Sequence, residues 1–146
     1  MLSFTSSLSH SSDALAIFVN ENYEYSNKKG VLSNDIVKKI NAFLKTLREK
    51  KNDESINFFD ISEKRKCFII KVKNKYKSYI PQEDGGTFFS YIKKIKDINR
   101  IDLYVDSLNF DKEKMINFFS EFAFGFNLKS YVFNKYKTVK KDKFNK

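Results

Sequence analysis

The chain has 146 residues and a formal net charge of +10, and 41% of its residues are hydrophobic, sixteen of them phenylalanines. A domain of this length buries about 68–70% of the surface that its unfolded chain exposes, so the composition excludes a disordered chain and a core that needs disulfides. The single cysteine, Cys67, also excludes an intrachain disulfide. Because no apolar stretch approaches a membrane span and residues 1–20 lack a signal-peptide pattern, we expect a cytoplasmic protein without membrane contact.

The first half of the chain predicts a strand, a helix and two further strands. After an apolar start and a serine-rich turn, residues 14–19 are apolar on both alternating faces, which is typical of a strand covered on both sides. Ser33 can cap a helix whose apolar residues recur at helical spacing up to Leu47. Residues 56–61 and 66–73 predict two strands, and residues 74–79 predict a lysine-spaced edge that continues the second.

The second half predicts a helix, a strand and a final helix. The segment Pro81–Gly86 is the strongest break in the sequence, and Thr87 can cap the helix that follows it. Residues 101–106 alternate between apolar and polar, which predicts a half-covered strand with its polar face toward solvent. Asp111 caps the last helix, whose expected core ridge is Met115, Phe119, Phe122 and Phe126, with Ile116, Phe118 and Ala123 alongside.

This order of elements predicts an α/β fold with three α/β/α layers and a mixed, largely parallel sheet. We expect one domain over residues 1–134, followed by a basic linker or tail over residues 135–146. That tail holds six lysines and one aspartate, a net charge of +5, so half of the chain's excess charge lies there.

Few residues of the sequence suggest a catalytic or metal-binding site. His10, the only histidine, lies in the serine-rich turn close to Asp13, and we interpret it as an exposed turn residue because catalytic triads are recognised by geometry. Cys67 lies within an apolar strand and is expected to be a small buried hydrophobe. One histidine and one cysteine cannot form a structural zinc site of the usual type.

Two further groups of residues receive structural interpretations. The segment Gly85–Thr87 can present backbone N–H groups to an anion, but a turn and a helix cap explain it fully, and four glycines in the chain leave little for an ADP-ribose site. Four carboxylates lie near one end of the last helix without a partner motif for acid–base catalysis, and capping accounts for those at the helix start. These four are Asp106, Asp111, Glu113 and Glu121.

The basic tail is the best candidate for contact with nucleic acid. Its lysines are interleaved with aromatic residues, and aromatic rings can stack on bases while lysines neutralise phosphates. The candidate contact residues are Lys135, Lys137, Lys140, Lys141 and Lys143. The alternative is a basic linker between domains.

The segment from Phe118 to Thr138, FFSEFAFGFNLKSYVFNKYKT, resembles a domain boundary in the leucine aminopeptidases, also called cytosol aminopeptidases. Its residues Gly125, Tyr131 and Phe133, followed by Tyr136 and Lys137, fall in the order found in that family. In the family, this boundary joins an N-terminal α/β domain with a macro-domain-like sheet to the catalytic domain.

The resemblance implies a non-catalytic role for this chain. In the family, the following domain holds two divalent metals, such as zinc or manganese, around an Asn-Thr-Asp-Ala-Glu-Gly-Arg segment that is absent here. We therefore expect that this chain has no catalytic, cofactor-binding or metal-binding residues. Its expected partners are its own catalytic domain and, in the intact enzyme, the other subunits of a homo-hexamer. Since some bacterial members of the family bind DNA, a nucleic-acid-binding module that uses the basic tail is the alternative.

Overall fold

The computed structural model describes residues 3–5, 12–28, 30–73 and 75–144 of the chain. These residues belong to two compact units. The first unit consists of Met1–Lys75 with Asp97–Phe110, and the second consists of Tyr76–Lys96 with Asp111–Lys146.

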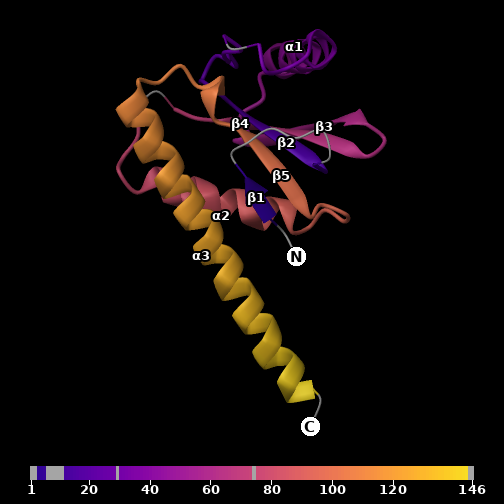
Figure 1. Cartoon of the computed structure of the whole chain (residues 1–146), viewed down its shortest axis with the longest axis vertical. Helices are drawn as coiled ribbons and strands as arrows, with labels where there is room; N and C mark the ends of the chain where they lie inside the picture. The colour runs from indigo at the N-terminus through magenta and orange to yellow at the C-terminus, as the bar shows by residue number, and fades with distance from the viewer. Residues whose placement is uncertain (1–2, 6–11, 29, 74, 145–146) are drawn as a thin grey trace. The chain divides into compact units, whose positions relative to one another are not determined.

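The first unit contains a five-stranded sheet in the order β1-β5-β2-β4-β3 (Figure 1). Neighbouring strands are parallel, except that β3 runs antiparallel to β4 at one edge. The α/β class with a mixed, largely parallel sheet is therefore confirmed. The strands are β1 (Ser3–Thr5), β2 (Ala14–Val19), β3 (Ile56–Ser62), β4 (Arg65–Lys71) and β5 (Arg100–Tyr104).

The central strand β2 is the one that the sequence predicts best, because all six of its residues are buried. Both expected strands of the β3–β4 pair also form, with bounds that differ by one or two residues. Strand β1 was not expected. It pairs with β5 over only three residues, Ser3 to Thr5 against Arg100 to Asp102, a length too short to show an alternating pattern.

Helix α1 (Asn34–Glu49) covers one face of the sheet. Its buried residues recur every three or four positions, as expected from the sequence, and they join side chains from the three central strands in one core. Each such fully buried aliphatic side chain stabilises the fold by about 1.5–3 kcal/mol. The shared core includes Ile40, Leu44 and Leu47 of α1, Leu15, Ile17 and Val19 of β2, Cys67 and Ile69 of β4, and Tyr104 of β5.

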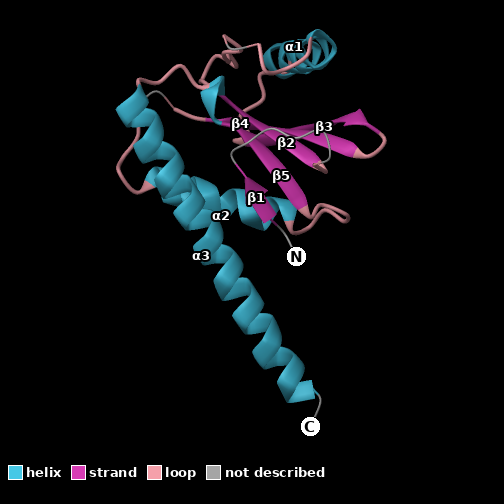
Figure 2. Ribbon diagram, in the orientation of Figure 1, coloured by secondary structure: helices cyan, strands magenta, loops and turns pink. Residues whose placement is uncertain are grey.

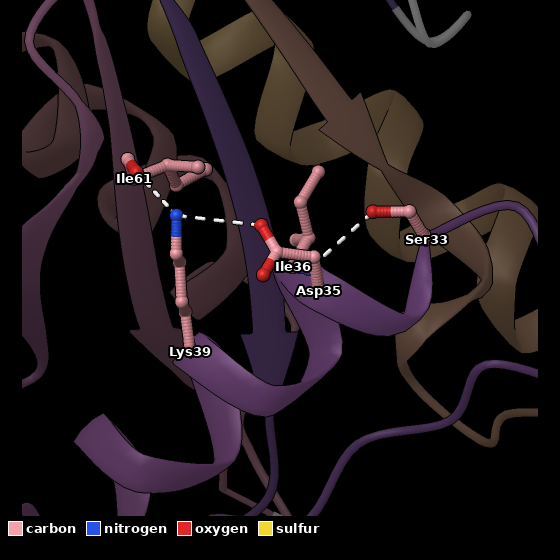
Figure 3. Close-up of polar contacts among 5 residues, drawn as sticks. All are labelled: Ser33, Asp35, Ile36, Lys39 and Ile61. Carbon is pink, nitrogen blue, oxygen red and sulfur yellow. Dashed lines mark hydrogen bonds and ion pairs between the residues drawn. The ribbon is translucent and has the colours of Figure 1, made fainter.

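Polar contacts fix the start of α1, as Figure 3 shows. The Ser33 hydroxyl oxygen accepts a hydrogen bond of 3.3 Å from the backbone N–H of Ile36, which confirms the expected N-cap. Lys39 Nζ donates to the backbone carbonyl of Ile61, the penultimate residue of β3, at 3.0 Å and lies 3.4 Å from the Asp35 carboxylate. The first turns of α1 are thereby tied to the edge strand of the sheet.

Strand β5 differs from the half-covered strand that its alternating pattern predicts. Asp102 and Tyr104, the expected solvent-facing residues, are 0% and 3% exposed. The reason is that Asp102 and Tyr104 lie beside Leu15 and Ile17 of β2, on the face of the sheet that α1 covers. The carboxylate of Asp102 is matched by the guanidinium of Arg65, with 3.7 Å between Oδ2 and Nη2. After a 3₁₀ turn, η1 (Val105–Ser107), the chain leaves the sheet.

The second unit contains α2 (Ile80–Ile92) and α3 (Lys112–Phe144), both drawn in cyan in Figure 2. The predicted break at Pro81–Gly86 is wrong, because these residues form the first turns of α2, and Thr87 lies inside this helix instead of capping it. Proline is compatible with the first turn of a helix, where its missing N–H has no partner to lose. The expected edge strand over residues 74–79 is also wrong, since the described residues 75–79 form no strand.

Helix α3 begins as expected, but its buried ridge differs from the prediction. Asp111 caps it, with the backbone N–H of Lys114 donating to Oδ1 at 2.8 Å. Among the α3 residues whose side chains the structure describes, the fully buried ones are Phe118, Phe122 and Phe126, a stripe with a spacing of four residues. Ile116, which was expected beside the ridge, is 55% exposed. Hydrophobicity alone did not show which side of α3 is buried, because phenylalanines occur on both the predicted and the observed buried side of the helix.

Candidate functional site

The two helices of the second unit approach each other unusually closely, and two glycines make this approach possible. A side-chain carbon at Gly85 of α2 would overlap the carbonyl oxygen of Phe122, and one at Gly125 of α3 would overlap the carbonyl oxygen of Gln82. The absence of a Cβ atom at both positions lets the two backbones touch. The turn and helix cap predicted at Gly85–Thr87 are therefore wrong, because Gly85 lies inside α2 at a helix–helix contact.

Aromatic rings form the remainder of the contact between α2 and α3. Phe88 lies 6.0 Å from both Phe122 and Phe126, measured between ring centroids. Phe89 meets Phe126 at 5.4 Å and Phe133 at 5.8 Å, in both cases edge to face. Such pairs contribute about 0.5–1.5 kcal/mol each beyond the area that they bury. The buried half of α3 is thus explained by its contact with α2.

A second apolar stripe on α3 faces solvent. Phe124, Leu128, Tyr131 and Val132 recur at a spacing of three or four residues, so they lie along one side of the helix. Their exposed fractions are 55%, 51%, 64% and 55%. We call these four residues the apolar face of α3. Apolar residues that are exposed singly are ordinary, whereas a contiguous apolar patch marks a site of interaction.

A shallow groove between α2 and α3 continues this face. The groove has a volume of about 610 Å³, and its α3 wall includes Leu128 and Val132 of the apolar face together with Gly125. Gly86 and Thr87 line its α2 wall. Polar residues, among them Gln82, Glu83 and Lys129, complete its lining.

The predicted nucleic-acid residues lie at the end of α3. The expected basic tail is helical in its backbone up to Phe144. Lys135 is exposed, and the side chains of Lys137, Lys140, Lys141 and Lys143 lie outside the described part of the structure. Just before this segment, Nζ of Lys93, the residue that follows α2, lies 4.7 Å from the centroid of the Phe133 ring, so this ring already has a cation as its partner.

The other candidates have structural roles where the structure describes them. Cys67 is fully buried in β4, as expected, and burial raises the pKa of its thiol. Asp111 caps α3, and Glu121 accepts a hydrogen bond from the Gln82 side chain. His10 lies outside the described residues.

The described residues offer neither a metal centre nor a membrane span. They contain no group of three or more histidine, cysteine or acidic residues that is arranged to hold a metal ion. None of the described helices combines the length and the apolar character that crossing a membrane requires.

The fold and the surface together define a class: an α/β domain that carries a paired-helix unit with an exposed apolar face. Comparison of the chain with protein-family models, with curated proteins and with solved structures found no match.

Proposed function

We propose that this chain is a non-catalytic N-terminal accessory domain of a metal-dependent leucyl aminopeptidase, and that it acts in assembly and in packing against the following domain. The intact protein would remove N-terminal amino acids from peptides with two divalent metals, such as zinc or manganese, bound in its catalytic domain. The accessory domain would belong to a cytoplasmic homo-hexamer.

The observation that carries this proposal is the apolar face of α3. It lies within Phe118–Thr138, the segment whose sequence resembles the boundary before the catalytic domain in leucine aminopeptidases. Four side chains with more than half of their surface exposed favour a covering partner, because burial of one such side chain stabilises an interface by about 1.5–3 kcal/mol. A domain that follows α3 would begin within a few helical turns of this face, since α3 ends at Phe144.

Two measurements test the accessory role. The first is the nucleotide sequence after the codon for Lys146, which is expected to continue into a region that encodes an Asn-Thr-Asp-Ala-Glu-Gly-Arg segment. A stop codon at that point would contradict the two-domain protein. The second is hydrolysis of leucyl-anilide by the purified chain, with and without added manganese or zinc. No turnover is expected, and turnover that follows the protein through repurification would overturn the proposal.

The apolar face can be tested separately by replacing Leu128 with glutamate in the longer protein. The charge would have to be buried at the proposed interface, so we expect weaker assembly by at least about tenfold in dissociation constant, measured by analytical ultracentrifugation. Asn127→Glu adds the same charge at the neighbouring exposed position outside the apolar face and should leave assembly unchanged. Both variants of the isolated chain should keep the thermal midpoint of the parent. Equal effects of the two variants on assembly would exclude the apolar face as the interface.

The second candidate function is nucleic-acid binding through the end of α3. It is favoured by the density of lysines there, six with one aspartate in residues 135–146, and by the helical backbone of α3 up to Phe144. Binding that depends on lysines weakens steeply with salt, because each neutralised phosphate releases counterions. Recognition would be largely independent of sequence, since such contacts go to the phosphate backbone.

Replacing Lys137, Lys140 and Lys141 with glutamine should weaken binding to duplex DNA and flatten its salt dependence. The slope of log K against log salt should fall by about 0.9 for each phosphate that the variant no longer neutralises. The matched control replaces three exposed lysines of α1 and its C-terminal end, Lys38, Lys45 and Lys50, and removes the same charge elsewhere. Equal weakening in the two triple variants would show a general charge effect, and retention of duplex DNA that does not depend on salt would contradict this function.

A further inference from the structure

A cavity of about 440 Å³ lies in the first unit, where the chain leaves its parallel strands. It is lined by residues that follow β2 (Asn20, Glu24, Tyr25), by Val72 after β4, and by residues after η1. Strand β2 lies between β4 and β5, and the chain runs from β2 to β4 on one side before it returns to β5 on the other. In open α/β sheets, ligands bind outside the carboxyl ends of the strands at such a reversal.

The loop that forms one wall is held in place by its own hydrogen bonds. Asn20 Oδ1 accepts from the backbone N–H groups of Asn22 and Glu24, each at 2.9 Å. The backbone N–H of Ser26 donates to the carbonyl of Ser107 at 2.8 Å and so joins the loop to the end of η1. The cavity is thus preformed, as small-molecule sites usually are.

Two opposite charges line this cavity. Lys28 Nζ donates to Asn109 Oδ1 at 3.1 Å, and Glu24 Oε1 accepts from Asn20 Nδ2 at 3.2 Å. Neither Lys28 nor Glu24 forms an ion pair with any residue in the described ranges. The rings of Tyr25 and Phe110, both partly buried, supply the apolar lining.

We propose that this cavity binds a free α-amino acid with an apolar side chain. The ligand carboxylate would pair with Lys28 beside the amide of Asn109, and its ammonium group would pair with Glu24. The apolar side chain would lie against Tyr25 and Phe110. One carboxylate and one lysine line the cavity, and this balance of charge favours a zwitterion. A ligand with two or more phosphates would require several cations or converging N–H donors, whereas the lining offers one lysine. This inference does not depend on the proposed accessory role.

The first test is calorimetric titration of the full chain with L-leucine, compared with leucinamide, which lacks the carboxylate, and N-acetylleucine, which lacks the ammonium group. A hydrogen bond to a charged group contributes enough to change affinity by about 10–100-fold, so both analogues should bind weaker by that factor. No binding at millimolar leucine, or equal binding of all three compounds, would overturn the proposal. Tighter binding of AMP or ADP-ribose than of leucine would also overturn it.

Two variants connect each charge of the ligand to one residue. Lys28→Met should weaken leucine binding by about 10–100-fold but leave leucinamide unaffected, since that analogue has no carboxylate to lose. Glu24→Gln should weaken leucine but leave N-acetylleucine unaffected. Lys38→Met, at a lysine of α1 away from the cavity, should change neither affinity. Parallel loss of all ligands in Lys28→Met would indicate a general disturbance and would contradict the assigned pairing.

Discussion

Replacing Gly125 with alanine is expected to destabilise the second unit by about 3 kcal/mol, since overpacking against a backbone cannot be relieved by a rotamer change. The new Cβ atom would overlap the carbonyl oxygen of Gln82, so α2 and α3 would have to separate. The same reasoning predicts a comparable loss for Gly85→Ala, whose Cβ would overlap the carbonyl oxygen of Phe122. Denaturant unfolding monitored by far-UV circular dichroism measures both losses.

The matched control is Gly86→Ala, one position along the same helix. There the nearest atom to the added carbon is the Gly125 carbonyl oxygen at 3.7 Å, an ordinary contact. Alanine is favoured over glycine in a helix interior by about 0.5–1 kcal/mol, so this variant should be more stable than the parent. Adjacent glycines are thus expected to respond with opposite signs. A neutral effect of Gly125→Ala would show that the helices cross at a larger distance than described.

The second large effect is expected at the buried ion pair of the central sheet. Asp102 is fully buried in β5, and Arg65 at the start of β4 supplies a cation 3.7 Å away. Arg65→Met would remove the cation and leave the carboxylate in the core, which costs about 3–5 kcal/mol. Replacing both residues with apolar ones, in the double variant Arg65→Met with Asp102→Leu, should recover much of that loss, because no buried charge remains.

The neighbouring pair of Lys66 and Asp60 provides the control. Its ions are 2.6 Å apart, closer than the buried pair, yet the side chain of Asp60 is 64% exposed. Solvent screening limits such pairs to about 1 kcal/mol or less, so Lys66→Met should be nearly neutral in the same unfolding measurement. Equal losses of stability in Lys66→Met and Arg65→Met would contradict the conclusion that burial makes the Arg65–Asp102 pair important. Failure of the double variant to recover stability would place the role of Arg65 in other contacts.

Much of the first unit could be predicted from local patterns. Strand β2 is apolar at every position, and α1 combines a serine cap with a regular apolar stripe, so each element is specified by its own residues. The sequence was less informative about β5. Its alternation of Ile101, Asp102 and Leu103 is typical of a strand with one face toward solvent, whereas its place between β1 and β2 puts Asp102 beside Leu15 on the face that α1 covers. Burial of Asp102 depends on those neighbours and on Arg65, which lies far away in the sequence.

The candidate sites, too, could be predicted from the sequence only in part. The density of lysines after Lys135 and the abundance of phenylalanine in α3 are visible in the order of residues alone. The sequence did not show which phenylalanines of α3 are buried. Their burial depends on where Gly85 and Gly125 allow α2 to approach α3. The cavity was not predicted either, since Asn20, Glu24 and Lys28 come together with Asn109 only when β2 and β5 pair.

Local composition and periodicity established an α/β chain with a capped first helix, an apolar central strand and a basic end, because these features depend on neighbours within a few residues. Contacts between distant segments established the rest: the burial of Asp102, the glycine crossing, the exposed apolar face and the charged cavity. Such contacts arise from backbone pairing and close packing, and a single sequence carries no local signal for them.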